Sequence, residues 1–191
     1  MKQYDIIVIG SGGGSKITRP AANLGLKVAI IEEAKLGGTC LNHGCIPSKM
    51  LIHPADVATI LKNAHRFEVD INDTPKVRFK DLVERVSREI DADSDSIAPL
   101  YENHENIDFY PYHASFISDK VIEVNGESLT ADKIFIVTGA RPHIPDIPGL
   151  KDTPFLTYKE ALRLTEQPKK LIVIGAGFIA TELGYFFGAL G

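Results

Sequence analysis

Apolar residues gather in four short runs that hold mostly β-branched side chains. The runs are Tyr4–Gly10, Lys27–Glu32, Lys133–Thr138 and Lys170–Ile174. A continuous run of this length is typical of a strand that is buried on both faces of a parallel sheet. We therefore expect these four segments to be strands.

Between the runs lie three segments that we expect to be helical, residues 15–24, 47–66 and 79–104. In the last of them apolar side chains recur at helical spacing, which predicts one or two amphipathic helices with a solvated outer face. Pro20 falls inside the first segment, where it removes a hydrogen bond, so a short or bent helix is expected there. Strands that alternate with helices predict an α/β fold.

The hydrophobic period changes to two between Ile107 and Thr138. Short strands are expected at residues 109–110, 114–117 and 121–124, and Asn125-Gly126 predicts a hairpin turn because both residues tolerate positive φ. The sequence thus predicts a Rossmann-like domain, a parallel sheet plus a β-meander, over residues 1–146. The proline-rich segment Pro142–Pro154 predicts a connector, so that residues 147–191 hold this connector and the first βα unit of a second domain.

Composition narrows the class of protein. The 191 residues carry a net charge of −4, and no basic stripe is present to neutralise nucleic-acid phosphates. Apolar runs of about 5–7 residues are too short to span a membrane. The chain opens on a strand pattern, without a cationic region followed by a cleavable apolar segment. We expect a cytoplasmic, soluble protein that binds neither nucleic acid nor membrane.

Two glycine-rich turns each follow one of the strand runs. The first, Gly10–Ser15, matches G-x-G-x-x-G except for a serine at the third glycine position, where close helix packing is expected to be strained but not lost because serine is small. In this motif the backbone approaches a pyrophosphate, which binds at the N-terminus of the following helix. Glu32 ends the next strand about 20 residues later, where a ribose-binding carboxylate belongs. The second turn, Gly175–Glu182, repeats the pattern, so the sequence predicts two dinucleotide sites.

The only two cysteines, Cys40 and Cys45, lie in the segment LGGTCLNHGCIPSK, residues 36–49. A disulfide that closes so short a loop would contribute only about 2 kcal/mol of stability, so reactivity explains the pair better. We expect Cys45 to lie near the start of a helix that Pro47 opens, one turn before Lys49. Both features stabilise a thiolate.

A dinucleotide site beside a dithiol, followed by a second dinucleotide site, suggests a chain of electron carriers. Nicotinamide transfers a hydride, whereas thiol–disulfide exchange requires a thiolate. A flavin exchanges electrons with both. We therefore predict FAD at the first glycine turn, NAD or NADP at the second, and the cysteine pair as a relay to a small-molecule dithiol or disulfide.

The segment GGTCLNHGCIPSK, the two glycine turns and the sequence VTGARP together resemble the FAD-dependent pyridine nucleotide–disulfide oxidoreductases. This family includes dihydrolipoamide dehydrogenase, glutathione reductase, mycothione reductase and mercuric reductase. The resemblance covers nearly the whole chain. CIPSK is most similar to dihydrolipoamide dehydrogenase, while the first glycine turn and Met50 are similar to mycothione reductase.

The resemblance implies a role for each motif residue. Cys40 would exchange with the substrate, Cys45 would contact the flavin, and Lys49 would pair with Glu182 near the reactive edge of the flavin. No metal ligand is implied. Together with the glycine turns, the predicted FAD-binding residues are Gly10, Gly12, Gly13, Gly14, Ser15, Glu32, Glu33, Gly38, Thr39, Lys49, His113, Ala114, Thr138 and Gly139; those for NAD(P) are Gly175, Gly177, Phe178 and Ile179.

The family's acid–base His–Glu pair, which acts on the active site of the partner subunit, matches none of the six histidines. The second dinucleotide unit also stops at Gly191, before its next strand. We therefore expect an N-terminal fragment, inactive alone, of a homodimeric enzyme. The expected activity is that of a dihydrolipoamide dehydrogenase, with a part in cell redox homeostasis.

Two alternatives stay open. One is a reductase of a low-molecular-weight disulfide, of the mycothione or glutathione type, or an enzyme similar to mercuric reductase. The other is a non-catalytic cofactor-binding fragment or redox sensor, in which the cysteines switch conformation or hold a metal together with His43 and His53.

Overall fold

The computed structural model describes residues 1–73 and 76–191. Contacts within the chain divide it into two compact units. Unit 1 comprises Met1–Asn42 and Asp91–Arg141, and unit 2 comprises His43–Ile90 and Pro142–Gly191. The domain boundary at residue 146 stays a prediction.

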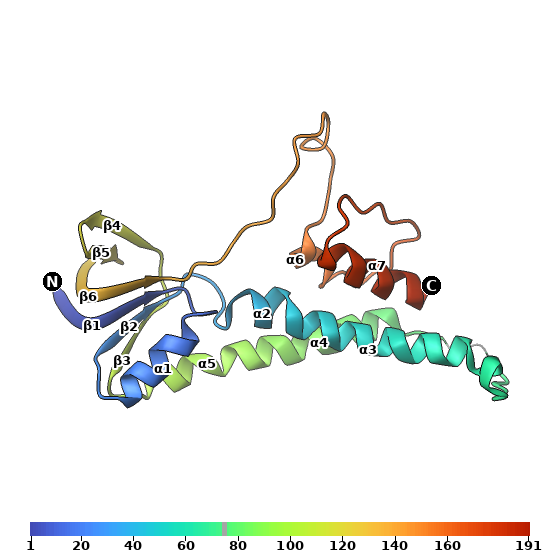
Figure 1. The fold of residues 1–191 in the computed structure, drawn as a ribbon, viewed down its shortest axis with the longest axis horizontal. Coiled ribbons are helices and arrows are strands. Elements are labelled where there is room, and N and C mark those ends of the chain that lie inside the picture. Colours follow the sequence, from blue (N-terminus) through green and yellow to red (C-terminus); the bar gives the residue numbers. More distant parts are fainter. Residues whose placement is uncertain (74–75) are drawn as a thin grey trace. The chain divides into compact units, whose positions relative to one another are not determined.

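Unit 1 is built on a six-stranded sheet with the strand order β3-β2-β1-β6-β5-β4 (Figure 1). Its strands are β1 (Lys2–Ile9), β2 (Val28–Ile31), β3 (Ile107–Tyr110), β4 (Ala114–Ser118), β5 (Val121–Val124) and β6 (Glu127–Ile136). β3, β2, β1 and β6 pair in parallel, and β5 and β4 continue the sheet with antiparallel pairing. Asn125 and Gly126, both at positive φ, form the turn between β5 and β6. The predicted α/β fold with a parallel sheet and a β-meander is confirmed.

Hydrophobic layers cover both faces of the central strands. On one face Ile6 and Val8 of β1 pack in a cluster with residues of α1 (Ser15–Asn23) and α5 (Ile97–Glu102), the helices that Figure 1 shows beside the sheet. On the other face Ile7 packs with residues of β5 and β6. Burial on two sides explains why β1 and β2 are apolar without alternation.

The helices of unit 1 follow the predicted segments closely. α1 is nine residues long, the short helix that was expected, and it continues past Pro20 to Asn23. The segment predicted as one or two helices forms two, α4 (Phe79–Asp95) and α5, of which the end of α4 belongs to unit 1. α2 (Gly38–His43) was not predicted as a helix.

Unit 2 packs α3 (Cys45–Lys62) against α7 (Phe178–Leu190), with η1 (Ala64–Phe67), the first part of α4 and α6 (Tyr158–Ala161) as its other elements. The Tyr185 hydroxyl donates to Asp56 Oδ1 at 2.7 Å, and Lys62 Nζ donates to the Ala189 carbonyl at 2.7 Å. Polar bonds at two points therefore fix α7 along α3.

The strand predicted at Lys170–Ile174 is absent, because the structure leaves this segment irregular. Its side chains are exposed, and none of the six strands in the described residues pairs with it. A strand needs a neighbour for its backbone hydrogen bonds. The prediction of a strand is wrong for this segment, although the glycine turn and the helix that follow it are formed.

Candidate dinucleotide and redox site

The first glycine turn approaches its neighbours so closely that side chains are excluded. A Cβ on Gly10, which has a φ of 104°, would lie 2.5 Å from the carbonyl oxygen of Val137. One on Gly14 would lie 2.1 Å from the Gly10 carbonyl oxygen and 2.5 Å from Val8 Cγ1. Gly14 caps α1 without a side-chain hydrogen bond, so a glycine turn leads directly into the helix N-terminus. A glycine turn that leads into a helix N-terminus is typical of phosphate-binding sites.

Gly14, and not position 15, provides the close approach between helix and strand. The Ser15 hydroxyl turns back on the loop and donates to the Gly12 carbonyl at 2.9 Å. The Ser15 side chain thus bonds to the turn, and the strained packing expected at this position stays a prediction.

The segment that carries Cys40 lies directly against the glycine turn. A Cβ on Gly38 would come within 2.5 Å of the Cα of Gly12, so the two backbones touch. The backbone N–H of Gly37 also donates to Ser11 Oγ at 3.1 Å. Thr39 and Cys40 follow in α2 with exposed side chains. The fold thus brings the predicted phosphate turn and the predicted redox loop together.

Glu32 is fixed at the end of β2 by the same turn. The backbone N–H and the hydroxyl of Ser11 donate to Glu32 Oε2 at 2.9 and 2.8 Å, and the Ala34 N–H donates to Oε1 at 3.0 Å. The carboxylate therefore lies where a ribose-binding group was predicted. Sequence reasoning missed Ser11, whose signal is a small polar residue between two glycines of the motif.

Other predicted residues lie at the same edge of the sheet, where the parallel strands end. Glu33 Oε2 and His113 Nδ1 are 2.8 Å apart, with both side chains exposed, and Ala114 begins β4. Thr138 and Gly139 follow β6. Just before them, the Val137 N–H donates to the Ile9 carbonyl at the end of β1, at 2.8 Å. In open α/β sheets this edge is the one that binds ligands.

In unit 2, Lys49 of α3 forms an ion pair with Glu182 of α7, the partners that the resemblance implies. The hydrogen bond from Lys49, and after it one from Ser48, lowers the pKa of Glu182 below its usual range. Cys45 is exposed and is the first residue of α3, two positions before the predicted start at Pro47. Lys49 therefore lies one helical turn after Cys45, as predicted.

The second glycine turn is more open than the first. Gly175 has a φ of 118° and Gly177 caps α7, but a Cβ on either would meet nothing within 4 Å. Phe178 and Ile179 are exposed at the start of the helix. Their part in binding NAD(P) stays a prediction.

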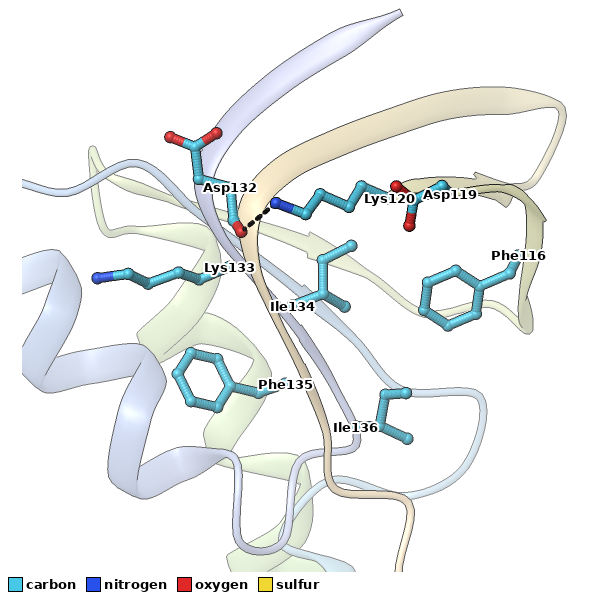
Figure 2. A pocket seen from close by; sticks show the side chains of 8 residues that line it. All are labelled: Phe116, Asp119, Lys120, Asp132, Lys133, Ile134, Phe135 and Ile136. Atoms are coloured by element: carbon cyan, nitrogen blue, oxygen red, sulfur yellow. Dashed lines mark hydrogen bonds between the residues drawn. The ribbon is translucent and has the colours of Figure 1, made fainter.

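A pocket of about 530 Å³ lies at the edge of β6 (Figure 2). Figure 2 shows the ring of Phe116 facing Ile134 across it. Pairing between β5 and β6 ends at Thr130, so the later part of β6 has β1 on one side only. The lining contains none of the predicted cofactor-binding residues; it consists of Phe116, Asp119, Lys120, Asp132, Lys133, Ile134, Phe135 and Ile136. This hollow marks an open sheet edge and is separate from the glycine turn.

Across residues 1–73 and 76–191, no group of three or more His, Cys, Asp or Glu side chains is placed to hold a metal ion. The alternative of a metal site with His43 and His53 therefore gains no support. In the same part of the chain, no helix has both the length and the apolar character needed to cross a membrane.

Three features together define a dinucleotide-binding redox protein. They are a glycine turn at the edge of a parallel sheet where the strands end, a carboxylate that follows the second strand, and a cysteine loop in contact with the turn. The family model for pyridine nucleotide-disulphide oxidoreductases matches residues 4–191, and the chain belongs to this family. Its members are FAD-dependent enzymes that use NAD(P)H, which confirms the predicted class and cofactors.

Similar proteins match nearly the whole chain. Mercuric reductase of Staphylococcus aureus is 38% identical over 190 residues, 98% of this chain and 34% of that protein. Mycothione reductase of Mycobacterium tuberculosis is 36% identical, over 100% of this chain and 42% of that protein. Dihydrolipoyl dehydrogenase of Acholeplasma laidlawii is 32% identical, over 100% of this chain and 58% of that protein. The HOCl-induced flavoprotein disulfide reductase RclA of Escherichia coli superposes with a TM-score of 0.84 at 30% identity, over 98% of this chain and 40% of that one.

The residues of unit 1 fit FAD. Gly10 and Gly14 have no room for a Cβ, so the turn packs closely on the sheet, while Gly13 is exposed and the Glu32 carboxylate is held beside the turn. The chain spans between about a third and three fifths of the length of these curated relatives.

Proposed function

We propose that this chain is the FAD-binding part of an enzyme that passes electron pairs between NAD(P), FAD, the Cys40–Cys45 pair and a small-molecule dithiol. The contact between Gly12 and Gly38 carries the proposal. It puts the turn expected to bind the FAD pyrophosphate against the loop that holds Cys40. A redox cysteine needs that proximity to its cofactor, whereas a structural cysteine does not.

The chemistry balances as a two-electron exchange. In the oxidising direction a dithiol substrate gives two electrons and two protons to the Cys40–Cys45 disulfide, which breaks to two thiols while the substrate disulfide forms. Bound FAD supplies the link, because a flavin exchanges electrons with thiols and hydride with nicotinamide. NAD⁺ then takes a hydride, and one proton is released to solvent.

The side chains around these groups have separate tasks. Cys40 exchanges with the substrate and Cys45 faces the flavin. Lys49, held by Glu182, supplies a positive charge that stabilises negative charge on the reduced cofactor. Glu32 holds the ribose of the adenosine.

For the substrate we propose a dithiol of the dihydrolipoamide type with NAD⁺ as acceptor, since CIPSK is most similar to that group. Similarity to the mercuric and mycothione reductases makes Hg²⁺ and mycothiol disulfide the comparison substrates. A homodimeric assembly and a cytoplasmic location remain predictions.

The test uses the FAD-loaded enzyme of which this chain is proposed to be a part, and its Cys40→Ser and Cys45→Ser variants. We expect NADH formation from dihydrolipoamide in the unchanged protein and none in either variant, with FAD retained in all three. A long-wavelength absorbance band on two-electron reduction is expected in the unchanged protein and lost in Cys45→Ser. Faster turnover of mycothiol disulfide or Hg²⁺ would overturn the substrate assignment, and variants as active as the unchanged protein would overturn the relay. The 191-residue chain alone is expected to be inactive.

A further inference from the structure

Asn42 is buried within the redox loop, residues 36–49, and its side chain bonds two backbone carbonyl groups of that loop. Its side-chain Nδ2 donates to the carbonyl oxygens of Leu36 at 2.8 Å and Gly38 at 3.1 Å, and only 2% of the residue is exposed. Ser94, which is 3% exposed, donates its hydroxyl to the same Leu36 carbonyl at 2.7 Å. Two side chains from distant parts of unit 1 thus satisfy both lone pairs of one carbonyl.

The backbone turns sharply where the helix that carries Cys40 begins. Gly37 and Gly38 have φ values of 97° and 62°, so the backbone passes through the left-handed region at the first residue of α2, Gly38, and at the residue before it. Cys40 lies midway between Gly38 and Asn42 in the sequence. The side-chain bonds of Asn42 and Ser94 therefore fix the Leu36 and Gly38 carbonyls before this cysteine, and Asn42 ties them to the helix turn that carries it.

Asn42 holds this position at a cost. Its Oδ1 is buried and has no hydrogen-bond partner among the described residues. A buried acceptor left unpaired costs about 1–3 kcal/mol. A leucine of similar size would avoid that cost, so the value of the side chain at this position lies in the Nδ2 donor.

We propose that Asn42, with Ser94, is the positioning residue of the redox loop. It acts on Cys40 through the Leu36–Gly38 backbone, which contacts Gly12 and Ser11 of the glycine turn. This inference rests on the proposed function and extends it to how the thiol is held. A thiol that is held in place loses less freedom when its disulfide closes, so the anchor favours the oxidised Cys40–Cys45 pair.

Two variants separate this role from simple packing. Asn42→Asp keeps the shape and removes the amide donor, and Ser94→Ala removes one bond to the Leu36 carbonyl with little change in volume. Ser96→Ala is the matched control, because Ser96 lies near Ser94 in the sequence and its hydroxyl makes only an exposed bond to the Asp93 carbonyl, at 2.7 Å. The FAD content of each variant checks that the fold is retained.

The experiment equilibrates the FAD-loaded protein with dithiothreitol redox buffers, traps free thiols by alkylation and counts them by mass spectrometry. Oxidation of the pair sends two electrons and two protons to the oxidised buffer. We expect Asn42→Asp to lower the equilibrium constant for disulfide formation about tenfold, a shift of about 30 mV toward less negative potential. Ser94→Ala shifts it in the same direction by less, and Ser96→Ala leaves it unchanged.

Unchanged potentials in Asn42→Asp and Ser94→Ala, with FAD retained, would overturn the positioning role. If Asn42→Asp does not fold, Ser94→Ala decides alone. If the unchanged protein forms no Cys40–Cys45 disulfide, the proposed function fails, and amide hydrogen exchange then tests the anchor. Faster exchange in residues 36–42 of Ser94→Ala, but not of Ser96→Ala, supports the anchor, and equal exchange overturns it.

Discussion

Gly12 and Gly38 touch through their backbones, although 26 positions separate them in the sequence. A Cβ on Gly12 would lie 3.2 Å from the Cα of Gly38, and one on Gly38 would lie 2.5 Å from the Cα of Gly12. Neither contact can be relieved by rotating a side chain, because both partners are backbone. The distance between the glycine turn, Gly10–Ser15, and the redox loop is thus set by two residues without side chains.

Gly38→Ala is expected to destabilise unit 1 and weaken FAD binding. The φ of 62° costs an alanine about 1–2 kcal/mol, and the clash with Gly12 adds about 1–3 kcal/mol. Urea unfolding measures the loss of stability, and FAD fluorescence measures the loss of affinity.

Gly25→Ala is the matched control, since Gly25 has a φ of 84° but nothing within 4 Å of its Cβ position. It should show the strain of positive φ alone, with FAD binding unchanged. Equal losses of stability in the two variants would mean that the contact with Gly12 contributes nothing.

Much of the fold and part of the site could be predicted because their signals are local in sequence. The strand–turn–helix pattern around Gly10–Ser15 and the carboxylate of Glu32 depend on spacing within one βα unit, and the structure brings them together. Asn125-Gly126 likewise predicts a hairpin from two residues.

What the sequence could not show depends on long-range partners. Ser94 reaches the Leu36 carbonyl from 58 positions away, and no motif marks that serine. Gly14 excludes a side chain because of where Val8 lies, which only the packed turn reveals. Lys170–Ile174 has a strand composition but no pairing strand among the described residues. Composition indicates what a segment can form, and its neighbours decide whether it does.

Glu182→Gln is expected to lower stability slightly and in a pH-dependent way. The ion pair with Lys49 contributes at most about 1 kcal/mol, because the side chains are 61% and 31% exposed. Since the pKa of Glu182 is lowered in the folded state, this contribution is complete above the unfolded value of about 4.3 and is lost as pH falls through the folded value. Urea unfolding at pH 7 and at acid pH should show a difference between the two proteins that shrinks with acid. A difference that grows with acid would contradict the assignment.

Phe186→Ala is expected to remove much of the stability of unit 2. Phe186 is 1% exposed and its ring lies 5.6 Å from that of Phe79 and 5.0 Å from that of Phe187, measured between centroids. Deleting a buried phenylalanine costs about 3–5 kcal/mol. Phe178→Ala, in the same helix but 78% exposed, is the control and should cost far less. Thermal unfolding of both variants measures the contrast, and similar melting temperatures would contradict the packing.

Tyr4→Phe is expected to change how stability responds to alkali. The Tyr4 hydroxyl donates to Asp108 Oδ2 at 2.5 Å and lies 2.7 Å from the Tyr110 hydroxyl. Burial, and then the bond to Asp108, raises the pKa of Tyr4 far above its usual range. Above about pH 10 the unfolded chain therefore releases this proton while the folded chain keeps it, so stability falls by about 1.4 kcal/mol per pH unit from this group.

Phenylalanine at position 4 removes that part of the alkaline slope, at a cost of about 1 kcal/mol at neutral pH for the lost bonds. The two stability curves should therefore converge as pH rises above 10. Urea unfolding at pH 8, 10 and 11 measures this, with Tyr112→Phe as the control, because Tyr112 is exposed. Parallel curves for Tyr4→Phe and the unchanged protein would show that Tyr4 ionises as readily in the folded chain as in the unfolded one, and that its contact with Asp108 does not hold the proton.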